Sequence, residues 1–253
     1  MNNVLLDEYL KRLRLPTVAK NYERAAKEAN GNRVTFQEYL CSLLEQEVQS
    51  RDESRRKERL TRAKFPALKT LDNFKFEEVP SLDKKLVLQL FKGQYLQGAE
   101  NIVFIGPHGT GKSHLAIALG IQGCHDGRHV GFFTVAELIH QLIEARDDRQ
   151  VLKLQQKLAR YDLLILDELG MVDCKPDEAN LLFQVISSRY ERRSTIITTN
   201  LEFKDWTSVF CTQQLTAALL DRLIHRCQIV QINGESFRFK ESVRRKKSKE
   251  AVA

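Results

Sequence analysis

One eight-residue segment limits the folds open to this chain more than any other feature. Residues 106–113 read Gly-Pro-His-Gly-Thr-Gly-Lys-Ser and match the pattern G-x-x-x-x-G-K-[ST]. Such a loop needs a strand before it and a helix after it, because its N–H groups and the helix N-terminus must face one anion. The apolar run 101–105 and the amphipathic run 114–124 supply both. The segment predicts a phosphate-binding loop, with Lys112 on the β- and γ-phosphates and Ser113 on Mg²⁺.

From residue 72 onward, short β-rich runs alternate with helical stretches. This alternation is typical of a parallel sheet covered by helices on both faces. We therefore predict an α/β fold with a five-stranded parallel sheet. Before the first strand, Ser81 predicts the N-cap of a helix that ends near Gly93. The expected strands are residues 101–106, 129–134, 162–167, 194–200 and 228–233.

Two acidic residues follow one of these strands directly. Four apolar residues, 163–166, precede Asp167 and Glu168. Ligands of open α/β sheets bind at the carboxyl ends of the strands. We therefore expect Asp167 to hold Mg²⁺ and Glu168 to act as the general base on an attacking water. A base next to the metal ligand favours hydrolysis over binding alone.

Two further residues have the right chemistry for phosphoryl transfer. The strand 194–199 ends in Asn200, whose amide suits a place near the γ-phosphate and the attacking water. Arg222, in the helical segment 220–226, suits neutralising the charge that develops in the reaction, from its own or a neighbouring subunit. Taken alone, both residues also fit ordinary structural roles in a turn and on a helix surface.

The first third of the chain predicts three helices. Apolar residues recur at helical spacing over 4–13, Pro16 suits the first turn of a second helix, and Gly31 suits its end. Thr35 opens a capping box and an apolar stripe follows over 36–48. We predict an N-terminal helical domain over 1–68, an α/β domain over 69–240 and a basic tail over 241–253.

The net charge of +7 is concentrated in two segments. Residues 51–69 and residues 238–250 each carry a surplus of five positive charges, which leaves −3 for the remainder. A nearly neutral body with two basic segments is typical of a protein with a polyanionic partner, most often DNA.

The cysteines and the hydropathy pattern favour the cytoplasm. The five cysteines are an odd number without a C-x-x-C pair, which argues against a disulfide framework and a zinc site. No run approaches the roughly 18 apolar residues of a membrane helix, and the first residues do not form a secretory signal. We therefore expect no membrane partner. The cysteines are Cys41, Cys124, Cys174, Cys211 and Cys227.

In their order, the segments GPHGTGKS, LLILDE, TIITTN, ALLDRLIHR and GESFR resemble the AAA+ ATPases of the initiator and helicase-loader group. More closely, the chain is similar to the IstB-like helper ATPases of insertion-sequence transposition. The resemblance covers nearly the whole chain, and the N-terminal helices and the DRLIHR…GESFR ending are its most specific parts. It implies an AAA+ core after a small helical domain, with ATP and Mg²⁺ as cofactors and hydrolysis of ATP to ADP and phosphate.

The resemblance also implies a role for each candidate residue. Lys112 and Ser113 match the Walker A pair, and Asp167 and Glu168 match Walker B. Ser113 and Asp167 are thereby the expected metal ligands. A second set completes the site: Asn200 at sensor 1, Arg222 as an arginine finger on a neighbour's ATP with Arg226 as its rival, and Arg238 as a sensor-2-type residue.

The same resemblance places the start of the adenine pocket at residues 71–76. Lys112, Glu168, Asn200 and Arg222 form the expected catalytic set. The residues expected to contact the nucleotide are Phe74, Gly106, Pro107, His108, Gly109, Thr110, Gly111, Lys112, Ser113, His114, Asp167 and Arg238.

By resemblance, the protein would assemble on duplex target DNA as an ATP-dependent ring or helical oligomer and deform that DNA. It would recruit and activate its cognate transposase, with the N-terminal domain contacting transposase or DNA. Hydrolysis of ATP would then regulate the complex.

Three other functions share parts of this pattern. A loader of a replicative helicase, of the DnaC or DnaI type, has the same catalytic motifs, but the N-terminal helices favour the transposition helper. Glu168 and the basic segments argue against a P-loop kinase of small molecules. The intact Lys112, Asp167 and Glu168 argue against a DNA-binding module with an inactive nucleotide site.

Deletion of residues 240–253 should weaken binding to duplex DNA and flatten its salt dependence. Each lost contact to a phosphate lowers the slope of log K against log salt by about 0.9. Fluorescence anisotropy over a series of salt concentrations measures both quantities. An unchanged slope would leave the tail as a solubilising segment.

Overall fold

The computed structural model describes residues 4–32 and 34–237. The chain divides into two compact units, Met1–Glu58 and Arg59–Ala253. The domain boundary predicted after residue 68 falls within the second unit, and the predicted basic tail lies outside the described residues.

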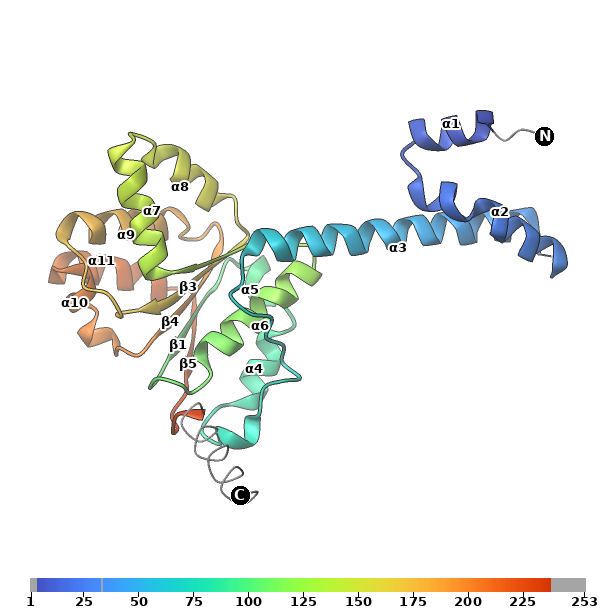
Figure 1. The fold of residues 1–253 in the computed structure, drawn as a ribbon. Coiled ribbons are helices and arrows are strands. Elements are labelled where there is room, and N and C mark those ends of the chain that lie inside the picture. Colours follow the sequence, from blue (N-terminus) through green and yellow to red (C-terminus); the bar gives the residue numbers. More distant parts are fainter. Residues whose placement is uncertain (1–3, 33, 238–253) are drawn as a thin grey trace, which may run out of the picture. The chain divides into compact units, whose positions relative to one another are not determined.

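The second unit is built on a parallel sheet of five strands in the order β2-β3-β4-β1-β5 (Figure 1). This confirms the predicted sheet, and every strand lies within two residues of its expected bounds. β1 pairs with β4 and β5, and β3 pairs with β2 and β4, all in parallel. The strands are β1 (Asn101–Ile105), β2 (Val130–Thr134), β3 (Leu163–Leu169), β4 (Ser194–Thr199) and β5 (Cys227–Gln231).

Helices cover both faces of the sheet, because alternate residues of each strand point to opposite sides. Ile102 and Phe104 of β1 pack in one core, together with α4, α5 and α6. Val103 and Ile105 pack in the other core, with α7 to α11. The helices are α4 (Lys84–Leu90), α5 (Gln94–Gln97), α6 (Lys112–His125), α7 (Val135–Asp147), α8 (Val151–Ala159), α9 (Pro176–Ser188), α10 (Thr207–Phe210) and α11 (Gln213–Ile224), with short 3₁₀ turns η1 (Phe76–Glu78) and η2 (Phe203–Asp205).

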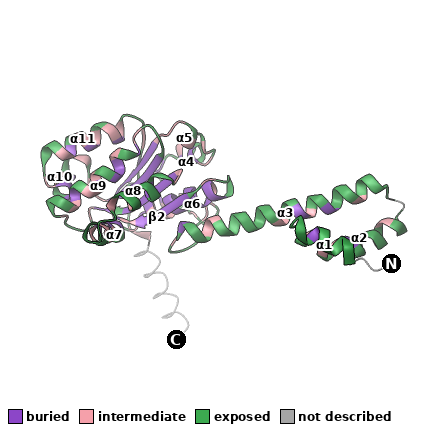
Figure 2. Cartoon of the chain, turned by 90° about the horizontal axis from the view of Figure 1, so that it is seen from above, coloured by how far each residue is buried: buried purple, intermediate pink, exposed green. Residues whose placement is uncertain are grey.

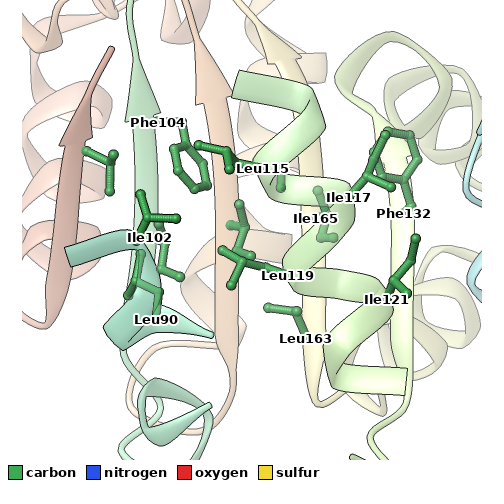
Figure 3. Packing of buried hydrophobic residues seen from close by; sticks show 14 of the residues in the cluster. Leu90, Ile102, Phe104, Leu115, Ile117, Leu119, Ile121, Phe132, Leu163 and Ile165 are labelled. Carbon is green, nitrogen blue, oxygen red and sulfur yellow. The ribbon is translucent and has the colours of Figure 1, made fainter. Parts of the chain in front are cut away.

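The helix that follows the phosphate-loop segment lies directly on the centre of the sheet. Figure 3 shows Leu115 and Leu119 of α6 packed among Phe104 of β1 and Ile165 of β3. All four side chains are almost completely buried. This packing fixes the N-terminal end of α6 above the carboxyl ends of the central strands.

One predicted helix begins later than expected. Asp83, and not Ser81, caps α4, and its carboxylate accepts a hydrogen bond from the Leu86 N–H at 3.1 Å. The Ser81 hydroxyl instead donates to the Asn233 carbonyl, a partner far away in sequence. The helix also ends at Leu90, before Gly93.

A buried arginine links the helices and strands that meet at the amino-terminal ends of the sheet's strands. Arg189, 2% exposed, donates to the Thr195 hydroxyl and to the carbonyls of Leu158, Tyr161 and Ser194, at 2.7–3.1 Å. Burial lowers the pKa of its guanidinium to about 10. These bonds join the ends of α8 and α9 to the beginning of β4.

The first unit contains α1 (Val4–Arg12), α2 (Pro16–Gly31) and most of α3 (Phe36–Ala63), which continues into the second unit. The predicted bounds of α2 are confirmed. So is the capping box before α3, in which the Thr35 N–H donates to the Glu38 carboxylate at 2.9 Å and the Glu38 N–H donates back at 3.3 Å. Within the described residues, no helix combines the length and apolar character needed to cross a lipid bilayer.

The core of this unit is small. Its buried apolar residues are Leu10, Val18, Tyr22 and Leu43. Most of the predicted stripe on α3 faces outward, which Figure 2 shows as exposed ribbon along this helix. The exposed members are Phe36, Leu40, Leu44 and Val48, with Phe36 at 92%.

A buried glutamate on α3 caps α2, the preceding helix of the unit. The Glu47 carboxylate accepts hydrogen bonds from the Thr17 and Val18 N–H groups at 2.8 and 3.2 Å and from Arg51 Nε at 2.8 Å. These N–H groups belong to the first turn of α2, which has no partners within its own helix. Arg51 also donates to the Arg14 carbonyl. Burial alone would raise the pKa of Glu47, but the hydrogen bonds from Arg51, Val18 and Thr17 outweigh burial and lower it.

Replacing Glu47 with Gln should loosen the start of α2. Because the pKa of Glu47 is lowered in the folded protein, its stabilisation is present above the pKa of an unfolded glutamate, about 4.3. It is lost as the pH falls through the lowered value. Hydrogen–deuterium exchange of peptides covering 16–31 should be faster in E47Q at pH 7, and the difference should shrink in acid. Glu45→Gln, at an exposed neighbour, is the control, and equal exchange in both variants would contradict this role.

Candidate nucleotide-binding site

A cavity of about 610 Å³ opens at the carboxyl ends of β1 and β3. This volume is in the usual range for small-molecule sites, roughly 300–1,000 Å³. The structure brings many of the predicted residues together here. Those that line the cavity are Phe74, Gly109, Thr110, Gly111, Lys112, Ser113, His114, Asp167 and Glu168.

The loop before α6 requires glycine at its two ends. Gly111 has φ +101°, and a Cβ there would lie 2.7 Å from the Phe74 ring. A Cβ on Gly106 would lie 2.1 Å from the Ile232 carbonyl oxygen. The loop therefore fits closely between the segment that carries Phe74 and the end of β5.

The N-terminus of α6 is left open for an anion. Gly111 is its N-cap residue, and no side chain caps this end of the helix within the described part of the chain. The first N–H groups of a helix lack acceptors within the helix and carry partial positive charge. A phosphate group is therefore a suitable ligand at this position.

Lys112 is held at the loop by its own backbone. The side chain is buried, and its Nζ donates to the carbonyls of Gly106 at 2.8 Å and Pro107 at 2.6 Å. Phosphate oxygens are charged and accept stronger hydrogen bonds than these carbonyls do. The ammonium group is thus already placed where a bound phosphate would meet it.

The side of the cavity formed by residues 70–76 and His114 is aromatic. His114 Nε2 lies 2.8 Å from the Thr70 carbonyl, and its ring meets Phe74 edge to face at 5.3 Å between centroids. Burial lowers the pKa of His114, which favours the neutral imidazole with Nε2–H donating to Thr70. Phe74 also contacts Phe76 edge to face, at 4.9 Å. These contacts bind residues 70–76 to the first turn of α6 and form an apolar wall suited to a base.

The two acids form a β-bulge in β3. Leu166 pairs with Ile197 and Leu169 with Thr199, so Asp167 and Glu168 together face one residue of β4. Asp167 is buried, whereas Glu168 is exposed to the cavity and has φ +66°.

The residue of β4 opposite this bulge is Thr198. Its hydroxyl donates to Asp167 Oδ1 and accepts from the Glu168 N–H at 3.0 Å. Sequence reasoning missed Thr198. The available signal was a hydroxyl two residues before Asn200 in the expected strand 194–200.

The oxygen donors in the cavity fit Mg²⁺. Ser113 and Asp167 both line it, and Mg²⁺ prefers hydroxyl, carboxylate, water and phosphate oxygens. Within the described residues, no group of three or more His, Cys, Asp or Glu side chains forms a metal cage. A Mg²⁺ ion at this place would therefore depend on nucleotide phosphates for much of its coordination.

Other predicted residues lie near the cavity without lining it. Gly106, Pro107 and His108 belong to the loop itself, and His108 is exposed. Asn200 directly follows β4, so it lies at the same edge of the sheet as the acids. Arg238 lies outside the described residues.

The two candidate arginine fingers lie away from this cavity. Arg222 is in the last turn of α11, where its guanidinium stacks over Phe183 at 5.3 Å. Arg226 directly precedes β5, at the amino edge of the sheet, and Nη1 donates to the Gly98 carbonyl at 3.4 Å. Neither side chain lines the cavity of its own chain.

Sequence comparison identifies close relatives over most of the chain. Residues 8–245 match the family described as IstB-like ATP binding protein. An ATP-binding protein of insertion sequence IS21 from Pseudomonas aeruginosa is 36% identical, over 93% of this chain and 89% of the relative. One from insertion sequence IS232 of Bacillus thuringiensis subsp. berliner is also 36% identical, over 92% of each chain.

Solved structures share the fold at lower identity. DnaA from Aquifex aeolicus, bound to AMPPCP, superimposes with a TM-score of 0.54 at 21% identity, over 66% of this chain and 50% of DnaA. DnaI superimposes with a TM-score of 0.53 at 16% identity, over 66% of this chain and 89% of DnaI. The fold that the resemblance implies for the second unit is thereby confirmed.

Replacing Gly111 with Ala should weaken nucleotide binding by about tenfold or more. The substitution forces a side chain into a left-handed conformation, which costs roughly 1–3 kcal/mol, and pushes against Phe74. Isothermal titration with ATP measures the effect. Gly234→Ala is the control, because no atom lies within 4 Å of its added Cβ. Equal affinities in the two variants would show that the loop does not need this glycine.

Proposed function

Because the chain belongs to the family of IstB-like ATP-binding proteins, we propose that it is an ATP-driven helper of DNA transposition. As a member of this family it is an AAA+ ATPase. In our proposal it assembles on duplex target DNA, deforms it and recruits the transposase, and ATP hydrolysis regulates the complex. The observation that carries the proposal is the cavity that Lys112, Asp167 and Glu168 share.

The phosphate side of this cavity supports tight binding of a triphosphate. We propose that Lys112 and the open end of α6 hold the β- and γ-phosphates. Ser113 and Asp167 would ligate Mg²⁺, which neutralises charge on the phosphates during their transfer. On the aromatic side of the cavity, Phe74 and His114 would form the wall against which the adenine base lies.

Glu168 suits the role of general base. Its carboxylate is exposed to the cavity, whereas Asp167 is buried beside it. This difference supports a division of roles, with Asp167 on the metal and Glu168 on the attacking water. Asn200, at the same edge of the sheet, would orient that water.

The positions of the arginines support assembly. Arg226 lies at the opposite end of the sheet from Lys112, and Arg222 lies in the last turn of α11, shortly before it in the chain. A side chain there can reach a γ-phosphate only in a neighbouring subunit. We therefore propose that Arg222, or its rival Arg226, completes the site of the next subunit in a ring or helical oligomer.

Two features support contacts with DNA and transposase. Residues 51–58 of α3 are all exposed and include Arg55, Arg56 and Lys57, which suits a contact with phosphates. The N-terminal unit also exposes large apolar side chains such as Phe36 and Leu40, which suits a protein contact. The relatives that belong to insertion sequences make the transposase the natural partner. The likeness to replication proteins extends only to the fold, so it does not favour a helicase loader.

The wider proposal is tested with the full chain, duplex DNA and the transposase of the same insertion sequence. Light scattering should show larger particles on duplex DNA with ATP than with ADP, and these particles should retain the transposase. Assembly that is indifferent to the nucleotide would contradict the proposal.

Replacing Glu168 with Gln should stop hydrolysis while ATP remains bound. Loss of a general base costs about 10²–10⁴-fold in rate. Phosphate release with duplex DNA measures turnover, and a fluorescent ATP analogue measures affinity, which should stay within a few-fold of wild type. Asp173→Asn removes an exposed carboxylate outside the cavity and is the control. Wild-type turnover in E168Q would remove Glu168 from this role.

A further inference from the structure

One buried hydroxyl connects the two acids of the site. Thr198 is 1% exposed, and its Oγ1 is bonded to both residues of the bulge in β3. It donates its proton to Asp167 Oδ1 and accepts the Glu168 N–H at 3.0 Å. A hydroxyl has one proton and two lone pairs, so a single threonine can make both bonds at once.

The bulge explains why the strand needs such a partner. The extra residue of a bulge is left out of the ladder of backbone hydrogen bonds, and a buried N–H without an acceptor is costly. The Thr198 hydroxyl supplies that acceptor for Glu168. It thereby helps to hold Glu168 at φ +66°, a conformation that residues other than glycine rarely adopt.

The hydrogen bond from Thr198 to Asp167 fixes the orientation of the Asp167 carboxylate. With Oδ1 held by Thr198, the carboxylate cannot rotate freely about its last bond, and Oδ2 is the oxygen left for a metal. A carboxylate held in advance loses less freedom when a ligand binds.

We infer that Thr198 is a positioning residue that sets Asp167 for Mg²⁺ and Glu168 for water through one hydroxyl. This inference rests on the proposed hydrolysis of ATP at this site. Thr198 itself touches neither nucleotide nor metal in this scheme, and it does not line the cavity. Its removal should therefore leave binding of metal-free nucleotide unchanged and weaken the part of binding that depends on Mg²⁺.

The next residue offers a matched control. Thr199 is equally buried at 1% and lies on the same strand. Its hydroxyl donates to the Leu169 carbonyl at 2.8 Å and accepts from the Leu201 N–H at 3.0 Å, so it also makes two bonds but none to an acid. Valine at either position removes a buried hydroxyl with nearly the same shape.

The experiment compares Thr198→Val, Thr198→Ser and Thr199→Val in the full chain. Affinity for a fluorescent non-hydrolysable ATP analogue is measured in EDTA and over a Mg²⁺ titration, and phosphate release is measured in parallel. In T198V we expect the affinity for the analogue in EDTA to be unchanged. The Mg²⁺ concentration that gives half of the increase in affinity should rise about fivefold or more. The kcat for phosphate release should fall about 10–100-fold, with little change in KM. T198S should recover most of both effects, and T199V should keep the Mg²⁺ dependence of wild type.

Wild-type Mg²⁺ dependence and kcat in T198V would overturn the inference, as would equal losses in T198V and T199V. If T198V melts far below wild type, Thr198→Ala replaces it in the same comparison with T198S. Failure of the inference about Thr198 can be distinguished from failure of the proposed function. A wild-type protein that binds the analogue but never releases phosphate would refute the proposed function, while the Mg²⁺ titration would still test Thr198.

Discussion

The parallel pairing of β1, β4 and β3 is the constraint on which the site depends. Because these strands run side by side in one direction, their carboxyl ends meet at one edge of the sheet. The loop with Lys112 follows β1, Asp167 and Glu168 lie at the end of β3, and Asn200 follows β4. The packing of α6 on the sheet then fixes the open helix end over the same edge. The side of the cavity that we propose binds the phosphates therefore depends on the order of the strands.

The side of the cavity that we propose binds the base has a different origin. It is assembled from segments far apart in the sequence that close on the loop and on α6. Thr70 and Phe74 reach it from the region before the sheet, through the contacts with His114 and Gly111. Phe237 approaches from the region after β5, where its N–H donates to the Gly109 carbonyl at 2.9 Å. The segment with Thr70 and Phe74 and the segment with Phe237 thus both contact the phosphate loop or the first turn of α6. A change in the conformation of that loop would therefore displace both segments.

The N-terminal unit is held together by a small apolar core and one buried carboxylate. Four buried apolar residues provide a small core, and the Glu47 carboxylate adds a cap that joins α3 to the start of α2. The apolar residues that α1 and α3 expose are more numerous than those they bury. In the function proposed above, this arrangement suits a unit that binds partners, while the α/β unit binds and hydrolyses ATP.

The sequence by itself determined the features that arise from neighbouring residues. These are the glycine-rich loop between strand and helix, the five strands, the bounds of α2 at Pro16 and Gly31, and the capping box at Thr35. Only the tertiary structure decided the features that depend on residues across the fold. Ser81 bonds to Asn233 and leaves the cap to Asp83, Glu47 caps a helix other than its own, and Phe36 is exposed on its apolar stripe. Thr198 holds the acids because a bulge in β3 lies opposite it, and no local pattern encodes which residue of one strand faces a bulge in another.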